Sequence, residues 1–139
     1  MNRQDAKDAK EEPSERLDSL AHSVIGAAIE VHSCLGPGYL ESVYEEAMAI
    51  ELEFRGILFE RQKTVSVNYK GTEVGQGRLD FFVGGQLVVE LKTVDTLLPL
   101  HKAQVISYLK VTGCHLGLLI NFNVRLVKEG IQRVVFSEQ

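Results

Sequence analysis

One stretch decides the fold of this chain: RLDFFVGGQLVVELK, residues Arg78–Lys92. Apolar and charged residues alternate on both sides of Gly84-Gly85-Gln86, which is typical of two antiparallel strands joined by a short loop. Asp80 lies on the first predicted strand, and Glu90 lies on the second with Lys92 two positions after it. The chemistry of the stretch depends on whether these side chains share one face of the sheet.

The length of the loop decides which face each carboxylate occupies. With a two-residue loop, Asp80 pairs with Val89 and Glu90 points to the opposite face. With a three-residue loop, Asp80 lies directly opposite Glu90, and a β-bulge would restore the same match. Only the three-residue loop separates an apolar face (Leu79, Phe81, Val83, Leu87, Val89 and Leu91) from one that carries Arg78, Asp80, Glu90 and Lys92, with Phe82 and Val88 near the turn. We therefore predict the three-residue loop.

Two opposed carboxylates predict a metal site. Directly opposed residues lie roughly 5 Å apart at Cβ, and like charges at that distance destabilise a sheet unless a cation offsets them. Carboxylate oxygens suit a hard cation such as Mg²⁺. A lysine beside them, here Lys92, orients or deprotonates a water for attack on a phosphodiester. The alternative is a solvent-exposed strand face, where Glu-x-Lys arises by chance.

The N-terminal half of the chain predicts two helices. Residues 1–15 are rich in charge and poor in large apolar residues, so we expect a flexible leader before one domain of residues 16–139. A helix from Arg16 to the break at Gly36-Pro37-Gly38 has a buried stripe: Leu17, Leu20, Ala21, Val24, Ala28 and Val31. A second helix from Tyr39 to Arg55 has its apolar face at Leu40, Val43, Ala47, Ile50 and Phe54.

Strands dominate the rest of the chain. Alternation at Val65, Val67 and Tyr69 predicts a strand, followed by strands at about 74–83 and 87–94. A helix from Pro99 to Gly113 and strands at 116–122 and 131–136 follow. The expected fold is α/β (α+β): a central mixed sheet with a three-stranded antiparallel meander, flanked by helices.

Composition limits the function classes. The chain has 139 residues, 45% of them hydrophobic, and no apolar run of membrane-spanning length or signal peptide, so we expect a soluble, cytoplasmic protein. Cys34 and Cys114 are far apart, which argues against a zinc module and a disulfide framework. The net charge of −4 does not favour nucleic-acid binding through bulk electrostatics, although basic side chains can cluster locally.

Helical spacing brings further polar residues into two pairs. Glu41 and Tyr44 share a face of the second helix, where Glu41 either reaches the metal or complements the helix dipole. Gln104 and Tyr108 share a face of the third helix, as a polar wall that orders the lysine, a water or a phosphate, or as an exposed Gln and a half-buried Tyr.

Basic residues are the candidates for contact with a phosphate backbone. Arg78 and Lys102 are the nearest such residues in the predicted arrangement, besides Lys92. The alternative for both is ordinary solvated surface charge. The four histidines show no tight ligand spacing, and we expect none of them to bind the metal.

The chain resembles the GxxExxY proteins, a bacterial and archaeal group in the PD-(D/E)xK nuclease superfamily. The resemblance covers about Leu17 to Phe136 and includes, in order, Gly38-x-x-Glu41-x-x-Tyr44, Arg78-x-Asp80, Glu90-Leu91-Lys92, Gln104-x-x-x-Tyr108-Leu109 and Gly117-Leu118-Leu119-Ile120-Asn121-Phe122. The superfamily core of a helix, a three-stranded meander, a helix and a further strand matches the predicted order.

The resemblance implies a metal-dependent nuclease. It implies that Asp80, Glu90 and Glu41, together with the Leu91 carbonyl, hold Mg²⁺, for which Mn²⁺ substitutes. Lys92 then activates the attacking water, and Gln104 and Tyr108 match the Gln-x-x-x-Tyr element of the lambda-exonuclease-like branch. Nucleic acid is the implied partner, with DNA favoured over RNA, and a homo-oligomer or protein partner is compatible with so short a chain. The alternatives are a non-catalytic nucleic-acid- or protein-binding module on the same fold and a site for another phosphate ester.

Overall fold

The computed structural model describes residues 14–137 and contains three helices, five strands and a 3₁₀ helix within that range. In chain order these are α2 (Glu15–Leu35), α3 (Glu41–Phe54), β1 (Phe59–Tyr69), β2 (Thr72–Val83), β3 (Leu87–Lys92), α4 (Pro99–Thr112), β4 (Leu116–Asn121), η1 (Val127–Gly130) and β5 (Ile131–Val135). The predicted order of helices and strands is confirmed, while η1 was not predicted. Most of the predicted leader lies outside the described residues.

Local sequence sets the ends of the helices. The Ser14 hydroxyl accepts the Leu17 N–H at 3.1 Å and so caps α2. Helix α4 begins with Pro99 in its first turn and ends at Gly113, which has the left-handed φ of 72° that glycine adopts without strain. His101 accepts the Leu98 N–H through Nδ1 at 2.9 Å, so this histidine is part of the α4 cap.

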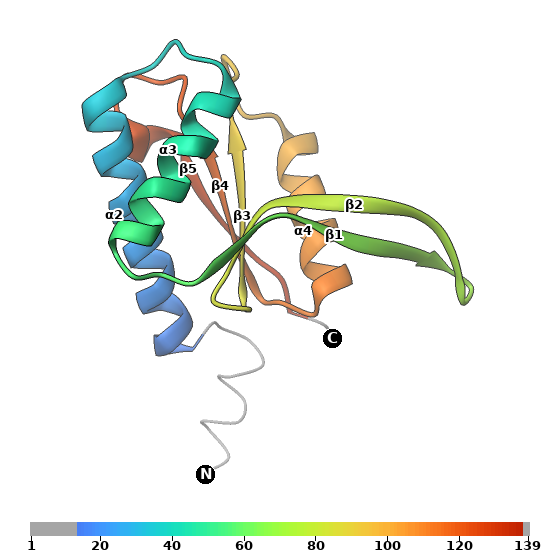
Figure 1. Cartoon of the computed structure of the whole chain (residues 1–139). Coiled ribbons are helices and arrows are strands. Elements are labelled where there is room, and N and C mark those ends of the chain that lie inside the picture. Colours follow the sequence, from blue (N-terminus) through green and yellow to red (C-terminus); the bar gives the residue numbers. More distant parts are fainter. Residues whose placement is uncertain (1–13, 138–139) are drawn as a thin grey trace.

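A single mixed sheet forms the centre of the molecule, with the strand order β1-β2-β3-β4-β5. Strands β3 and β4 are parallel, and the other neighbouring pairs are antiparallel. Helix α4 makes the crossover that a parallel pair requires. Helices α2 and α3 cover one face of the sheet and α4 covers the other (Figure 1). No helix among residues 14–137 has the length and apolarity needed to cross a bilayer.

The two faces of the sheet carry separate hydrophobic clusters. The larger one packs beneath α2 and α3, and the smaller one packs beneath α4. Strand β4 is buried on both faces, which explains its continuous apolar sequence. Leu79 belongs to the cluster beneath α4, with Val88 and Val105, although the alternation placed it on the Phe81 face. That part of the prediction was wrong: Leu79 and Phe81 lie in different hydrophobic clusters, on either side of the position where the Gln62–Asp80 pair is missing from the β1–β2 ladder.

The predicted inner face of α3 was also wrong. Leu40, Val43, Ile50 and Phe54 are exposed, and the buried residues are Tyr44, Met48, Ala49 and Leu52. The helix carries two apolar stripes, and periodicity alone does not show which of them packs on the sheet. The bounds differ slightly too: α3 begins at Glu41, after Leu40 in an extended conformation.

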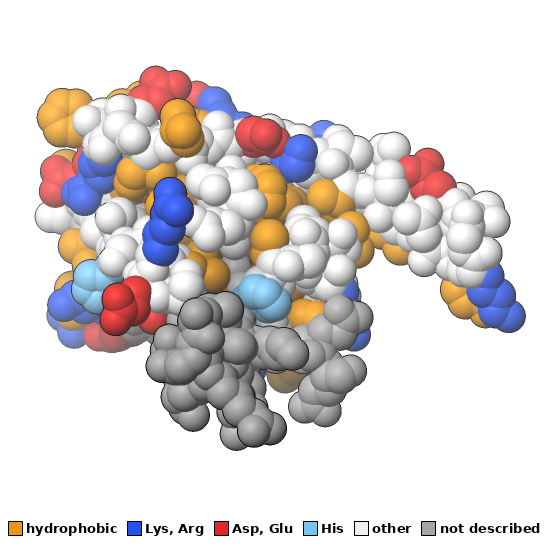
Figure 2. Space-filling view, turned by 90° about the horizontal axis from the view of Figure 1, so that it is seen from below, with side chains coloured by type: hydrophobic (Ala, Val, Ile, Leu, Met, Phe, Trp, Pro, Cys, Tyr) orange, Lys and Arg blue, Asp and Glu red, His pale blue; other side chains and the backbone are white. Residues whose placement is uncertain are grey.

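Strands β1 and β2 extend well beyond the body of the molecule. We call residues 64–78 the arm; it projects past α4 as a two-stranded ribbon (Figures 1 and 2). Its turn contains Lys70 and Gly71, both with positive φ. Strand β1 begins at Phe59, six residues before the alternation that predicted it. The site described next lies where the arm leaves the sheet.

Candidate functional site

The hairpin between β2 and β3 has the predicted three-residue loop. Val83 pairs with Leu87 and Phe81 pairs with Val89, which places Asp80 next to Glu90 in the register. Beyond the Phe81–Val89 pair, hydrogen bonds from backbone N–H groups to side-chain carboxylates take the place of the backbone–backbone hydrogen bonds of the ladder. The Asp80 N–H donates to Glu90 Oε2 at 2.7 Å, and the Leu91 N–H donates to Asp80 Oδ2 at 2.8 Å. Each carboxylate is thus fixed by the backbone of the other strand.

The carboxyl groups of this site repel one another electrostatically. The surrounding protein also shields them from water. Glu90 is only 3% exposed, and burial together with the neighbouring Asp80 raises its pKa to about 8. Burial also raises the pKa of Asp80, opposed by the Leu91 N–H, and the charge of Glu45 raises it further. Desolvation raises the pKa of the Glu41 carboxyl group, and the charge of Asp80 adds to the effect. A bound cation would relieve all three interactions.

Helix α3 delivers Glu41 to the edge of this cluster. The Tyr44 O–H donates to the Gly36 carbonyl at 2.5 Å and accepts the Tyr39 N–H at 3.3 Å. Its ring stacks on Phe122 with 4.5 Å between centroids. Tyr44 is fully buried and holds the turn before α3, so its visible role is structural, while Glu41 is exposed at the start of the helix.

Helix α4 supplies a polar row beside the carboxylates. Lys92 Nζ donates to Gln104 Oε1 at 3.5 Å, and Gln104 Nε2 donates to the Tyr108 hydroxyl at 3.4 Å. Tyr108 also hydrogen bonds to the backbone of Arg78. Its ring packs on Gly77, where an added Cβ would lie 2.7 Å from Tyr108 Cε1. The row therefore links Lys92 to the base of the arm.

Sequence reasoning missed Gln62, which contacts the site from β1. Its φ is 51°, and the Gln62–Asp80 pair is missing from a ladder that pairs Arg61 with Phe81 and Lys63 with Leu79. The Gln62 amide donates to a carboxylate oxygen of Glu45 and, at 3.5 Å, to Asp80 Oδ1. No local sequence signal marks a glutamine in this conformation. It is a left-handed, non-glycine residue beside a cluster of carboxylates.

Asn121 fixes the chain that follows Lys92. Its Oδ1 accepts the Val94 N–H at 3.0 Å, and its Nδ2 donates to the Val94 carbonyl at 2.8 Å. The Phe122 N–H donates to the Lys92 carbonyl at 2.9 Å. The buried amide thus aligns the end of β3 with the end of β4, and the motif that contains Asn121 was its sequence signal.

Comparison with known proteins identifies the superfamily. A model of the PD-(D/E)XK nuclease superfamily matches residues 18–134. The chain belongs to the PD-(D/E)XK nuclease superfamily. No curated protein matches it. Among solved structures, the crystal structure of SSO0001 is 24% identical, in a match that covers 70% of this chain and 49% of that one, with a TM-score of 0.48. This chain therefore spans about half the length of that protein.

PD-(D/E)XK nucleases in general use divalent metal ions, and the donor set here is of the right chemical kind. Glu41, Asp80 and Glu90 offer carboxylate oxygens, the ligands that hard cations prefer. Burial raises the pKa of all three, and the charge of Asp80 raises the pKa of Glu41 and Glu90 further. Within residues 14–137, however, no three His, Cys, Asp or Glu side chains form a ready-made metal cluster. One carboxylate oxygen of Asp80 and one of Glu90 each accept a hydrogen bond from a backbone N–H instead.

The two basic residues expected to contact phosphate, Arg78 and Lys102, lie in different places in the structure. Arg78 is exposed at the base of the arm, two residues before Asp80. Lys102 lies on the other side of α4 from Gln104, in a cavity lined also by Pro99, Gln132 and Arg133. Lys102 is therefore placed beside residues of β5, while Arg78 precedes Asp80 on β2.

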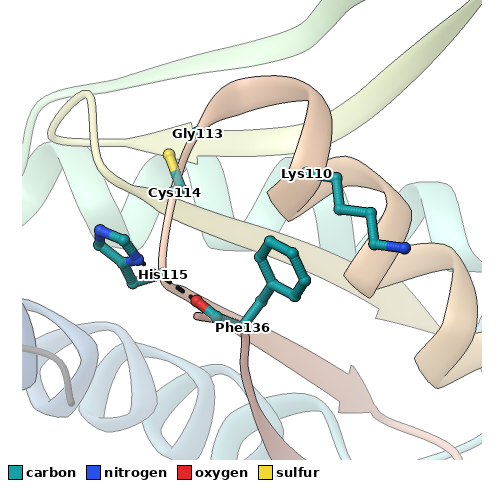
Figure 3. Close-up of a pocket in the computed structure, with 5 residues that line it drawn as sticks. All are labelled: Lys110, Gly113, Cys114, His115 and Phe136. Carbon is teal, nitrogen blue, oxygen red and sulfur yellow. Dashed lines mark hydrogen bonds between the residues drawn. The ribbon is translucent and has the colours of Figure 1, made fainter. Parts of the chain in front are cut away.

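Cavities are also found away from the carboxylates. One of about 250 Å³ is lined by Lys110, Gly113, Cys114, His115 and Phe136 at the C-terminal end of α4 (Figure 3). His115 Nδ1 lies 3.3 Å from the Phe136 carbonyl, which closes one side of it.

Proposed function

We propose that the protein is a metal-dependent nuclease of the GxxExxY group that hydrolyses phosphodiester bonds, with DNA favoured over RNA. The observation that carries the proposal is the Asp80–Glu90 arrangement, in which two partly or fully buried carboxylates with raised pKa values face a lysine held by Gln104. Membership of the superfamily supports the reaction class.

Mg²⁺, or Mn²⁺ in its place, is the implied ion, and Glu41, Asp80, Glu90 and the Leu91 carbonyl would hold it. When bound, it would polarise the phosphodiester and stabilise the charge that develops on the phosphate oxygens. The Leu91 N–H holds one Asp80 oxygen, and the Asp80 N–H holds one Glu90 oxygen, so the two carboxylates enter the reaction in a fixed orientation.

The remaining residues position the nucleophile and the substrate. Lys92 orients the attacking water, and its contact with Gln104 keeps the ammonium group beside the carboxylates. Tyr108 fixes Gln104 by hydrogen bonding and fixes the arm by packing on Gly77. Arg78, exposed next to this row, is placed for contact with a phosphate of the backbone.

A cleavage panel tests the proposal: single- and double-stranded DNA and RNA, linear and circular, with Mg²⁺ and with Mn²⁺. We expect cleavage that requires the metal and is abolished by Asp80→Asn and by Lys92→Ala. Glu129→Gln and Lys128→Ala, in η1 between β4 and β5, are the matched controls and should retain activity. Cleavage that survives both site substitutions would refute the assignment.

The alternative is a binding module without turnover, and one observation favours it. Asp80 and Glu90 already accept backbone hydrogen bonds and do not form a ready-made cluster within the described residues. Calorimetric titration with Mn²⁺ separates the two functions. A nuclease site binds the ion and loses it with Glu90→Gln, whereas a pure binding module shows no heat of metal binding with either protein.

A further inference from the structure

The arm is a two-stranded ribbon that packs on the body of the molecule at its base, where Tyr108 lies against Gly77. Beyond the base it projects from the layers of helices and sheet (Figures 1 and 2). Every residue from 66 to 76 is exposed, and this segment belongs to neither hydrophobic cluster. A two-stranded ribbon by itself is marginally stable, so the arm is a candidate for contact with a molecule outside the chain.

One face of the arm carries short side chains that form hydrogen bonds. In the β1–β2 register, Thr64 pairs with Arg78 and Ser66 pairs with Gln76, and paired residues share a face of the ribbon. Asn68 continues the row on β1, two residues after Ser66. We call these five residues the polar face of the arm. Within residues 14–137, no side-chain hydrogen bond uses Ser66, Asn68 or Gln76, so their donors and acceptors are available to a partner.

The basic residues of the arm have no ionic partner within the described part of the chain. Lys70 is at the tip and Arg78 is at the base, and neither takes part in a salt bridge there. Arg61 and Lys63, which precede the arm on β1, are instead both paired with glutamates. Glu73 is the one acidic residue of the arm, so the arm is positively charged on a chain whose net charge is −4. This charge fits an anionic polymer.

The shape and residue types of the arm favour one class of polymer. The major groove of B-form DNA is about 12 Å wide and admits a two-stranded ribbon. Its base edges are contacted by Asn, Gln, Ser, Thr and Arg, the residue types of the polar face, and a glutamate such as Glu73 accepts from cytosine there. The major groove of an RNA duplex is too deep and narrow for side chains to enter. Single strands bind to rows of aromatic rings, and the arm has only Tyr69.

The base of the arm adjoins the carboxylate site. Arg78 is two residues before Asp80 on β2, and Tyr108, which packs on Gly77, belongs to the polar row beside the carboxylates. The eight residues from Asp80 back to Thr72 at the tip span about 26 Å, at roughly 3.3 Å per residue. That length equals about eight base-pair steps of B-form DNA. A duplex bound at the carboxylates is therefore within reach of the arm.

From these observations we propose that the substrate of the protein is B-form duplex DNA, and that the polar face of the arm enters its major groove beside the bond to be cut. The proposal rests on the proposed nuclease function, because the carboxylates are what places the cut next to the arm. The arm supplies affinity and position, and the carboxylates supply the chemistry.

The first test measures binding in EDTA, where no metal-dependent cleavage takes place. Fluorescence anisotropy compares a labelled DNA duplex of about 24 base pairs, three times the reach of the arm, with the RNA duplex and the DNA single strand of the same sequence. We expect the native chain to bind the DNA duplex at least about tenfold more tightly than either. Replacing residues 66–76 with Asn-Gly should abolish this preference. Far-UV circular dichroism verifies that the shortened chain is folded.

Point substitutions test the arm without shortening it. Lys70→Ala should lower the slope of log affinity against log salt by about 1, the effect of one lost phosphate contact. Asn68→Ala combined with Gln76→Ala should weaken binding of the DNA duplex in EDTA. Val67→Ala, on the opposite face of the ribbon, is the matched control and should bind like the native chain.

The second test identifies the groove. Glucosylated 5-hydroxymethylcytosine fills the major groove without changing base pairing, so a duplex that contains it should bind at least about tenfold less tightly. Netropsin occupies the minor groove and should leave the affinity unchanged. Equal affinities for the plain and the glucosylated duplex overturn the proposal.

Two further outcomes overturn the proposal: equal binding of the DNA duplex by the native and the shortened chain, and tighter binding of the RNA duplex or the single strand. Failure of the nuclease assignment gives a different result. A chain that binds duplex DNA through the arm but cuts it with neither Mg²⁺ nor Mn²⁺ refutes the nuclease function and supports the contact in the groove. Metal-dependent cleavage by a chain whose DNA binding does not require the arm refutes the contact alone.

Discussion

Gln62 shows how one residue joins two parts of the site. Its side-chain amide donates hydrogen bonds to Glu45 on α3 and to Asp80 on β2. This bridge requires a left-handed backbone at position 62 and leaves a gap in the β1–β2 ladder. A non-glycine residue in this region costs of order 1 kcal/mol or more, so the surrounding contacts must hold it there. Gln62 is thus a positioning residue for Asp80.

We predict that Gln62→Ala and Gln62→Gly both lower Mn²⁺ affinity by roughly 10- to 100-fold, the usual effect of losing a residue that orients a metal ligand. Gly accommodates the positive φ without strain, so it should restore stability relative to Ala without restoring affinity. Calorimetric titration measures the affinity, and thermal unfolding measures the stability. Gln76→Ala, an exposed glutamine of the arm, is the control. Equal affinities for Gln62→Gly and the native chain would contradict this role.

Glu90 gives the metal-free protein a pH-dependent stability. Its pKa is about 8 in the folded protein, compared with the ordinary 4.5 expected after unfolding. Between these values the folded state holds a proton that the unfolded state has released, so the free energy of unfolding falls as the pH rises through this window. The raised pKa values of Asp80 and Glu41 act in the same direction.

We therefore predict that the metal-free protein is less stable at about pH 8.5 than at about pH 5, by a few kcal/mol at most. Glu90→Gln should flatten this dependence and raise the stability at high pH. Saturating Mn²⁺ should also restore stability at high pH, because the ion binds the folded state. Urea unfolding at several pH values, in EDTA and in Mn²⁺, measures all three. A stability that rises with pH across this window in EDTA would refute the prediction.

At the scale of elements, α3 connects the carboxylate site to the core through Tyr44. This tyrosine belongs to the motif by which the sequence resembles the GxxExxY proteins, and the helical spacing placed it on the same face as Glu41. The structure shows a buried ring stacked on Phe122 and a hydroxyl that holds the Gly36 carbonyl. The motif therefore combines one candidate ligand with the residue that fixes the turn before it.

Tyr44→Phe should retain the ring stacking and lose the hydroxyl contacts. We expect the variant to be destabilised by roughly 1–2 kcal/mol, because the Gly36 carbonyl loses its partner near the core. Metal affinity per folded molecule should change far less than with Glu41→Gln. Thermal unfolding and Mn²⁺ titration of both variants make the comparison. A large loss of affinity at unchanged stability would instead assign the hydroxyl to the site itself.

For some helices and strands the sequence was sufficient to predict the packing, and for others it was not. The hairpin register followed from the loop length and from one consistent apolar face, and the Val83–Leu87 pair confirms it. Leu79 departs from the same alternation next to the missing Gln62–Asp80 pair, a tertiary feature without a local signal. In α3, two apolar stripes coexist, and only the packed structure shows that Met48 and Leu52 face inward while Ile50 and Phe54 do not.

For the molecule as a whole, sequence predicted the layers and the mixed sheet but not the projecting arm. The alternation of apolar and polar residues at Val65, Val67 and Tyr69 is the same whether a two-stranded ribbon packs on the body of the protein or projects from it. The structure shows that residues 66–76 contribute no side chain to either hydrophobic cluster. Only the base of the arm is held, where Tyr108 packs on Gly77 beside Val65.

Shortening the arm should therefore leave the body intact. We predict that replacing residues 66–76 with Asn-Gly, which closes a tight hairpin between Val65 and Gly77, changes the free energy of unfolding by less than about 1 kcal/mol. Mn²⁺ affinity should also be retained, since Asp80 and Glu90 lie outside the deletion. Denaturant unfolding and calorimetry measure both. A body that unfolds without the arm would show that the ribbon contributes to the core fold after all.

The gap in the ladder opposite Asp80 has a mechanical consequence. The β1–β2 pairing is interrupted at Gln62–Asp80, and the β2–β3 pairing ends at Phe81–Val89, so neither ladder clamps the backbone of Asp80. A load applied at the tip of the arm is first carried by Leu79 and Tyr108, which hold the base of the arm at the cluster beneath α4. The next backbone position along β2 is Asp80, whose N–H is held by the Glu90 side chain rather than by a ladder hydrogen bond. The geometry of the two carboxylates therefore depends on how firmly the base of the arm is packed.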